Sequence, residues 1–302
     1  MLSSAPVSYL TSSSPLWVAG RALLAKRCFE LFACWNKAGR TLNHDAIQDL
    51  RSASRRVQEC VLLFEPCYRG DDIARFGKKL SRLTRRLGAI SSTGETLLFM
   101  EKFSGELSPH QQESSGALLD QLRQRREVQT RKVGGFLRKT RRHSLADLFK
   151  ELNKSPDLFG ATAVDPFMPV RRYLRSTLLP TLTEMGSLAA AGRCESASEA
   201  QHAWMSALRR LRYRLEIVTP VMLKGAPEPV TEILRRYQEL LERVHALDLY
   251  LELVKNMETD AETLEELVGI LTSKRSRLWI RLETLVEEQP WERLAARIEE
   301  CL

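Results

Sequence analysis

The sequence predicts an all-α protein of two four-helix bundles related by an internal pseudo-two-fold axis, as a tandem duplication would produce. Three observations lead to this prediction. Apolar residues recur at three- and four-residue spacing through most of the chain, and no stretch alternates as a strand does. The long segments are rich in Leu, Arg, Glu and Ala, which form helices at low entropic cost. The second half of the chain also repeats features of the first.

The helical pattern is interrupted by residues that cap or end helices. Asn43 is a candidate N-cap, and Pro66, Pro220 and Pro290 each follow an apolar segment. Residues 1–15 are Ser-rich without an early positive charge and are expected to form a flexible tail rather than a secretory signal. A loop near 152–166 divides the rest into a first bundle, 16–157, and a second, 158–302. The expected helices are 16–39, 44–65, 72–105, 115–142, 166–191, 196–219, 228–257, 261–288 and 291–301.

The internal repeat appears when the chain is shifted by 154 residues, which places 48–66 on 202–220. The same shift aligns Arg21 with Arg175 and Arg82 with Arg236. Two similar bundles would then bring equivalent basic helices toward each other across a central groove. The identical pairs within the matched segment are Ser52/Ser206, Ala53/Ala207, Arg55/Arg209, Arg56/Arg210 and Pro66/Pro220.

The charge balance predicts an anionic partner. The formal net charge is +8, and because 228–302 has an acidic excess, the rest of the chain is more basic than this average. No stretch approaches the roughly 18 consecutive apolar residues of a membrane-spanning helix, so membrane insertion is not expected. The six cysteines lack a CxxC pair, which favours reduced, packed thiols over a zinc site and indicates a cytoplasmic protein.

Two equivalent helical faces carry the candidate site. Arg51 and Arg55 stand one turn apart on the first, and His202, Arg209 and Arg212 lie beside Tyr213 on the second. Like charges at this spacing repel each other, which favours an anion between them. Arginine outnumbers lysine here, and its planar fork can bind phosphate oxygens through two hydrogen bonds. The remaining candidates for the same groove are Arg21, Lys79, Arg82, Arg86, Arg175 and Arg236.

Other interpretations remain open for these features. Each single arginine could lie on a solvated surface, and lone histidines such as His245 are typical surface or cap residues. A nucleic-acid-binding protein would fit the charge, although no helix-turn-helix or zinc-finger pattern is present. An enzyme of phosphate metabolism would need a Gly-rich phosphate loop, paired carboxylates or a metal cluster, and none is visible. A scaffold whose acidic C-terminal helices dock a partner is a third alternative.

The segment His202–Tyr213, HAWMSALRRLRY, resembles the CHAD family, the conserved-histidine α-helical domain. The family signature reads approximately His-x-x-Arg-x-x-x-Lys/Arg-Arg-Leu-Arg. Its counterpart in the first half, 48–58, looks like the same motif with Gln48 in place of the histidine, and Met205 stands where the family has arginine. The resemblance extends over almost the whole chain after residue 15.

The resemblance implies two four-helix bundles around a basic central channel that binds inorganic polyphosphate, with no catalytic activity, cofactor or metal. The family's basic positions fall on Arg51, Arg55, His202, Arg209 and Arg212 of this sequence. Inorganic polyphosphate, or another phosphate-rich polyanion, is therefore the expected partner, and nucleic acid is the less favoured one. The expected location is the cytoplasm, with association with polyphosphate granules as a further expectation.

Overall fold

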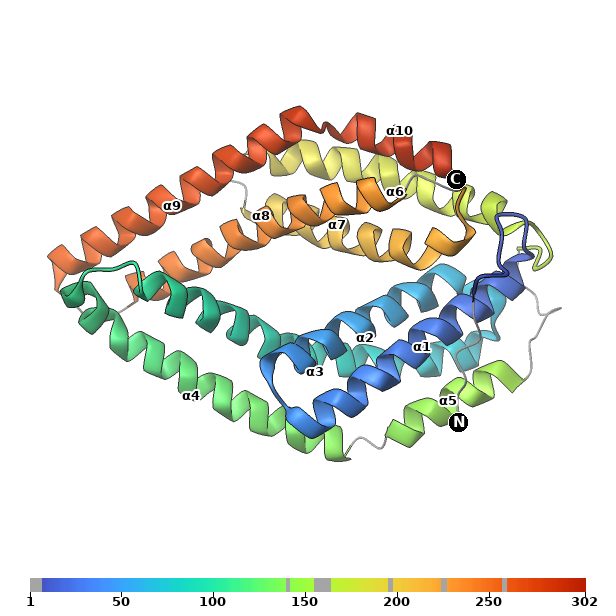
Figure 1. The fold of residues 1–302 in the computed structure, drawn as a ribbon, viewed down its shortest axis with the longest axis horizontal. Coiled ribbons are helices and arrows are strands. Elements are labelled where there is room, and N and C mark those ends of the chain that lie inside the picture. The colour runs from blue at the N-terminus through green and yellow to red at the C-terminus, as the bar shows by residue number, and fades with distance from the viewer. Residues whose placement is uncertain (1–6, 140–141, 155–163, 195–197, 224–226, 257–259) are drawn as a thin grey trace.

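The computed structural model describes residues 7–139, 142–154, 164–194, 198–223, 227–256 and 260–302, and within them the chain is all-α (Figure 1). The β-type pairing among these residues is one isolated bridge between Pro15 and Pro169. The α-helices are α1 (Leu16–Thr41), α2 (His44–Phe64), α3 (Gly70–Ser104), α4 (Pro109–Lys139), α5 (Arg142–Lys154), α6 (Val170–Gly192), α7 (Ser198–Val218), α8 (Pro227–Lys255), α9 (Ala261–Glu288) and α10 (Trp291–Cys301), with 3₁₀ turns at Glu65–Cys67 and Thr219–Val221.

Local sequence signals explain where several helices begin and end. The Asn43 side chain accepts a hydrogen bond from the Ala46 amide at 2.9 Å, which confirms it as the N-cap of α2. Pro66 and Pro220 lie in the 3₁₀ turns that end α2 and α7, as predicted. Helix α4 begins at Pro109, six residues before the predicted start, because proline is well suited to the first helical position.

The two halves repeat the same order of elements. Helices α2 and α7 begin and end 154 residues apart, and so do the two 3₁₀ turns. This agreement is consistent with a duplication. Each half also ends in a short fifth helix, α5 or α10. The sequence predicted a helix that ends at 142 and a loop near 152–166, so α5 was not among the expected helices. Its apolar stripe of Leu145, Phe149 and Leu152, all buried, is the signal that predicts it.

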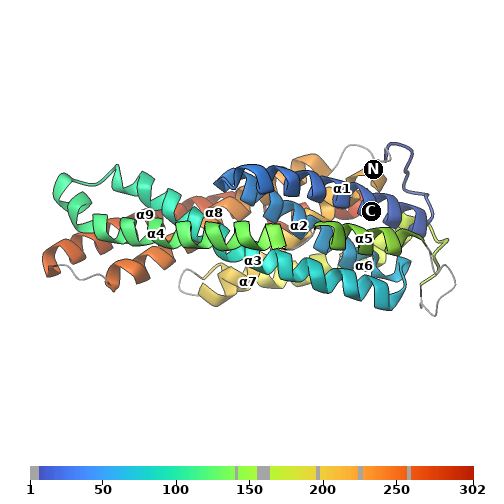
Figure 2. The same cartoon turned by 90° about the horizontal axis from the view of Figure 1, so that it is seen from below.

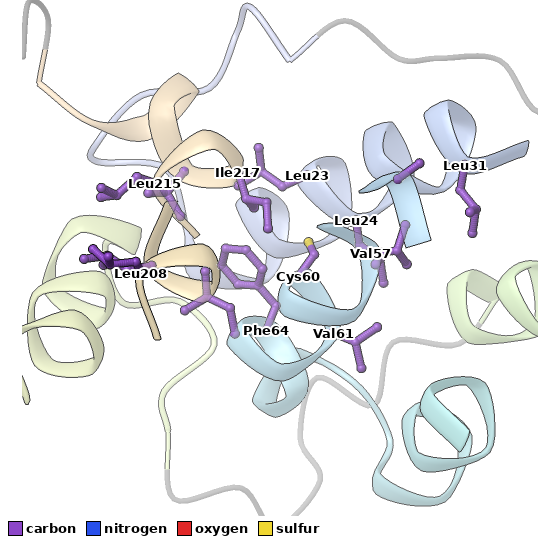
Figure 3. Packing of buried hydrophobic residues seen from close by; sticks show 14 of the residues in the cluster. Leu23, Leu24, Leu31, Val57, Cys60, Val61, Phe64, Leu208, Leu215 and Ile217 are labelled. Atoms are coloured by element: carbon purple, nitrogen blue, oxygen red, sulfur yellow. The ribbon is translucent and has the colours of Figure 1, made fainter. Parts of the chain in front are cut away.

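The two halves build the hydrophobic core jointly. The main cluster joins side chains of α1, α2, α3 and α5 to side chains of α6, α7, α8 and α10. Figure 3 shows part of this packing, with Phe64 of α2 near Leu208 and Ile217 of α7, and Cys60 of α2 near Leu24 of α1. A second cluster joins the C-terminal part of α3 and the N-terminal half of α4 to α8 and α9. The halves are thus in contact at both ends of the elongated molecule, which Figure 2 shows from below.

Part of the predicted flexible tail is packed against the second half. Leu10 is 5% exposed, the Val170 amide donates to the Ser14 carbonyl at 2.9 Å, and the Arg171 amide donates to the Ser12 carbonyl at 3.1 Å. Residues 7–15 are therefore anchored at the start of α6, which differs from the expected free tail; residues 1–6 lie outside the described part of the chain. All six cysteines are free thiols, and Cys28, Cys60, Cys67 and Cys301 are buried.

Candidate functional site

A cavity of about 450 Å³ lies between the two halves, and four helices line it. We call it the central cavity. Helices α2 and α3 contribute from the first half, and α7 and α8 from the second. The lining residues are Arg51, Arg55, Thr96, Phe99, His202, Met205, Ser206, Arg209, Glu239, Glu242, Arg243, His245, Ala246 and Leu249.

Packing of the apolar stripes aims the arginines at this cavity. On α2, Leu50, Ala53 and Val57 are buried in the core, so the neighbouring face with Arg51 and Arg55 turns toward the other half. On α7, buried Leu208 and Leu211 place Arg209 in the same way. The structure therefore brings together four of the residues predicted from the sequence: Arg51, Arg55, His202 and Arg209.

The positive charges lie close enough to perturb one another. Burial, followed by the nearby charges of Arg51 and Arg209, lowers the pKa of Arg55 to about 10, while a hydrogen bond with Tyr213 opposes this shift. Arg55 still carries its proton at neutral pH. The site thus holds like charges from both halves in a partly desolvated setting, where an anion would relieve their repulsion.

Carboxylates compensate part of this charge. Arg209 donates to Glu242 at 2.6 Å, and Gln238 also donates to Glu242, at 2.8 Å. Glu239 is paired with Arg235 on the same helix. The lining therefore has four arginines against two glutamates, and a ligand must compete with Glu242 for Arg209.

Two histidines from the second half meet at the cavity. The rings of His202 and His245 are 5.2 Å apart. Burial lowers the pKa of His245, and so do the charges of the neighbouring His202 and Arg209. The charges of Asp248 and Glu252 oppose this shift. A nearby anion would favour the protonated imidazole.

Arg212 and Tyr213 lie beside the central cavity without lining it. Arg212 donates to Gln238 at 3.0 Å and pairs with Glu216. Arg56, from the first half, also pairs with Glu216, at 2.7 Å. The guanidinium groups of Arg56 and Arg212 lie 5.3 Å and 4.7 Å from the centre of the Tyr213 ring. This network holds the two halves together behind Arg55.

Three other predicted residues lie elsewhere and are not in the central cavity. Arg21 donates to the carbonyls of Leu152 and Asn153 at 3.2 and 3.4 Å and so caps the C-terminus of α5. Arg175 pairs with Glu299 of α10 at 3.1 Å. Arg236 is exposed on α8. The expectation that these side chains supply the central groove does not agree with their positions.

Lys79, Arg82 and Arg86 are also absent from the central cavity. They line a different cavity of about 450 Å³ together with Arg85 and Phe136, between α3 and α4. Helix α3 turns Leu80, Leu83 and Leu87 into the core, and this rotation directs the basic stripe away from the second half.

Arg236 of α8 was predicted to lie in the groove, but the α8 residues that line the central cavity were missed. Glu239, Glu242, Arg243 and Ala246 follow one another at three- and four-residue spacing and form one helical face in the central cavity. That spacing is the signal that could have found them. His245 lines the same cavity, although the sequence predicted an ordinary surface or cap residue.

Metal sites and membrane spans can be assessed for the described part of the chain. Among the described residues, no group of three or more His, Cys, Asp or Glu side chains could hold a metal ion. None of the helices in the described ranges is sufficiently long and apolar to cross a bilayer.

Fold and site together define a class of helical proteins in which two repeated halves enclose an arginine-lined cavity. The chain belongs to the CHAD domain family, since the family model matches residues 23–254. This confirms the resemblance seen at His202–Tyr213.

Two solved structures share the fold. PptA from Streptomyces chartreusis superposes with a TM-score of 0.68 at 17% identity, covering 91% of this chain and 99% of its own. The CHAD domain from the plant Ricinus communis superposes with a TM-score of 0.61 at 16% identity, covering 97% and 94%. Comparison with curated protein sequences finds no match.

Proposed function

We propose that this protein binds inorganic polyphosphate, or another linear phosphate-rich polyanion, in the central cavity and does not catalyse a reaction there. The observation that carries the proposal is the convergence of Arg51 and Arg55 from one half with Arg209 from the other on one cavity. Membership of the CHAD family supports the same ligand. We propose that the complex forms in the cytoplasm and associates with polyphosphate granules there.

The physical basis of binding is charge neutralisation. Guanidinium groups form paired, charge-assisted hydrogen bonds with phosphate oxygens. A polyphosphate chain carries condensed counterions, as nucleic acids do, and their release makes binding tighter at low salt. Affinity should therefore fall steeply as the salt concentration rises.

The size of the cavity separates polyphosphate from the alternative ligand, nucleic acid. A space of about 450 Å³ accommodates a short stretch of a bare phosphate chain but not a base-paired helix. Duplex RNA should therefore fail to displace labelled polyphosphate. Displacement at equal phosphate concentration would instead favour the nucleic-acid-binding function.

Calorimetric titration with long-chain polyphosphate tests the proposal. The variant Arg55→Gln/Arg209→Gln should bind at least roughly tenfold more weakly than wild type, because each charged hydrogen bond contributes about 1.5–3 kcal/mol. Arg236→Gln is the control, since it removes a charge from an exposed position outside the central cavity. Equal affinities for wild type and the double variant, with unchanged circular dichroism, would overturn the proposal.

Catalysis is tested with the same preparations. Pure protein incubated with polyphosphate or triphosphate should release no phosphate above the background rate. Hydrolysis that a point mutation in the central cavity abolishes would show an enzyme instead.

A further inference from the structure

The cavity between α3 and α4 differs from the central cavity in its charge. Its lining consists of Lys79, Arg82, Arg85 and Arg86 of α3 with Phe136 of α4. Its described lining contains no carboxylate, whereas that of the central cavity contains two. We call it the outer cavity.

The four cations of the outer cavity occupy one face of a single helix. Lys79, Arg82 and Arg86 follow at three- and four-residue spacing, and Arg85 lies next to Arg86. Lys79 and Arg86 are separated by about 10 Å along the helix axis, at a rise of about 1.5 Å per residue. Like charges at this spacing destabilise an isolated helix. Several negative groups of one ligand could contact them simultaneously.

Neighbouring helices hold two of these cations in place. Lys79 donates to the Ser144 hydroxyl of α5 at 2.6 Å. The guanidinium of Arg86 lies 4.6 Å from the centre of the Phe136 ring, a cation–π contact that fixes its orientation. The outer cavity is thus shaped by α3, α4 and α5 rather than by one exposed helix.

All three arginines of the outer cavity lack acidic partners among the described side chains. Among the side chains that the structure describes, no carboxylate forms an ion pair with Arg82, Arg85 or Arg86. On the adjacent helix α4, by contrast, Arg123 pairs with Glu101 and Asp120, and Arg131 pairs with Glu127. The unneutralised arginines therefore mark this cavity as a place where an external anion would supply the missing charge.

We propose that the outer cavity is a second binding site, for a compact anion that carries several phosphates. Arginine forks suit phosphate geometry, and the absence of carboxylates means that no internal partner must be displaced. The two cavities share no lining residue. Arg86 precedes Thr96 of the central cavity by ten residues, which is about 15 Å along α3. The outer site is therefore distinct in position from the central one.

Calorimetric titration with tripolyphosphate tests this second site. Wild type should bind at two sites, and Arg82→Gln/Arg85→Gln should lose one of them or bind there roughly tenfold more weakly. Both arginines are exposed, so the variant should keep its fold and its circular dichroism. The matched control is Lys132→Gln/Arg138→Gln, which removes two exposed charges from α4 outside the outer cavity.

Two results would overturn the second site. One is unchanged stoichiometry and affinity in Arg82→Gln/Arg85→Gln. The other is an equal loss in the control, since this would show an effect of net charge alone. The variant Arg55→Gln/Arg209→Gln keeps the outer site intact, so it should still bind tripolyphosphate there even if the central cavity binds no polyphosphate.

A further titration distinguishes two sources of the phosphates. If the outer site takes a free small anion, Arg82→Gln/Arg85→Gln should bind long-chain polyphosphate as wild type does. If one long chain occupies both cavities, the same variant should bind that chain more weakly. The tripolyphosphate titration decides whether the outer site exists, and this second titration then decides which ligand fills it.

Discussion

At the scale of single residues, Arg55 and Arg209 define the chemistry of the central cavity. They are equivalent in the internal repeat, and the fold places both at the same cavity. Burial, followed by the charges of Arg51 and Arg209, lowers the pKa of Arg55. The protein maintains this unfavourable arrangement with one internal counterion for Arg209, Glu242, at 2.6 Å.

Removing that counterion should strengthen ligand binding. In Glu242→Gln, Arg209 no longer has a competing carboxylate, so affinity for long-chain polyphosphate should rise roughly two- to tenfold. Titration calorimetry measures the change. The control is Glu239→Gln, because Glu239 lines the same cavity but pairs with Arg235. Equal gains in the two variants would contradict a specific competition at Arg209.

The pKa of His245 predicts opposite effects of pH on binding and on stability. Its folded pKa lies below the unfolded value of about 6.5, so the unliganded protein loses stability as pH falls below about 6.5. Protonation adds positive charge to the cavity, so affinity for polyphosphate should rise between pH 7.5 and 5.5. His245→Asn should flatten both profiles. Affinity that is independent of pH in wild type would contradict this prediction.

At the scale of helices, the sequence predicts well where the helices lie along the chain. It does not predict toward which neighbouring helix each basic face turns. Asn43 and the prolines at 66 and 220 act where expected because capping and proline sterics are local. The face of α3 was not predictable, because its rotation depends on which helices cover it. Arg82 and Arg236 show the consequence: they are aligned by the repeat, and neither lines the central cavity.

Helix α2 is fixed to three other helices through Phe64. The ring is fully buried and lies 6.5 Å from the Tyr173 ring of α6. A β-carbon at Gly20 of α1 would meet it at 3.0 Å, so glycine is needed for this close approach. Figure 3 shows Phe64 between the side chains of α1 and α7.

Truncation of this ring should be costly. Phe64→Ala should lower the free energy of unfolding by about 3–5 kcal/mol, because it leaves a large cavity in the shared core. Chemical denaturation monitored by circular dichroism measures the difference. Leu62→Ala is the control on the same helix, since Leu62 is 52% exposed. Its cost should stay below about 1 kcal/mol, and equal losses would contradict the central position of Phe64.

At the scale of the whole molecule, the halves are joined by polar contacts as well as by apolar packing. Arg214 of α7 pairs with Glu59 of α2 at 3.0 Å. The Tyr173 hydroxyl donates to the Leu63 carbonyl at 2.7 Å. Far from these contacts, the Tyr250 hydroxyl of α8 donates to the Thr96 carbonyl of α3 at 2.8 Å. Periodicity indicated which face of each helix is apolar, but it could not show that the covering helix comes from the other half.

Neither half should therefore fold alone. Fragments 1–157 and 158–302 expressed separately should show reduced helicity and no cooperative melting, because each exposes apolar surface that the other half covers. Circular dichroism of the fragments, alone and mixed, measures this. A cooperative thermal transition in either isolated fragment would contradict a jointly built core.

The structure of the protein with long-chain polyphosphate tests the central claim most directly. We predict a linear chain of phosphates between α2 and α7, with oxygens at hydrogen-bond distance, about 2.7–3.0 Å, from the guanidinium groups of both Arg55 and Arg209. The Arg209–Glu242 pair should be broken or lengthened in the complex. An empty central cavity with that pair intact, and phosphate bound only at other surfaces, would contradict the account.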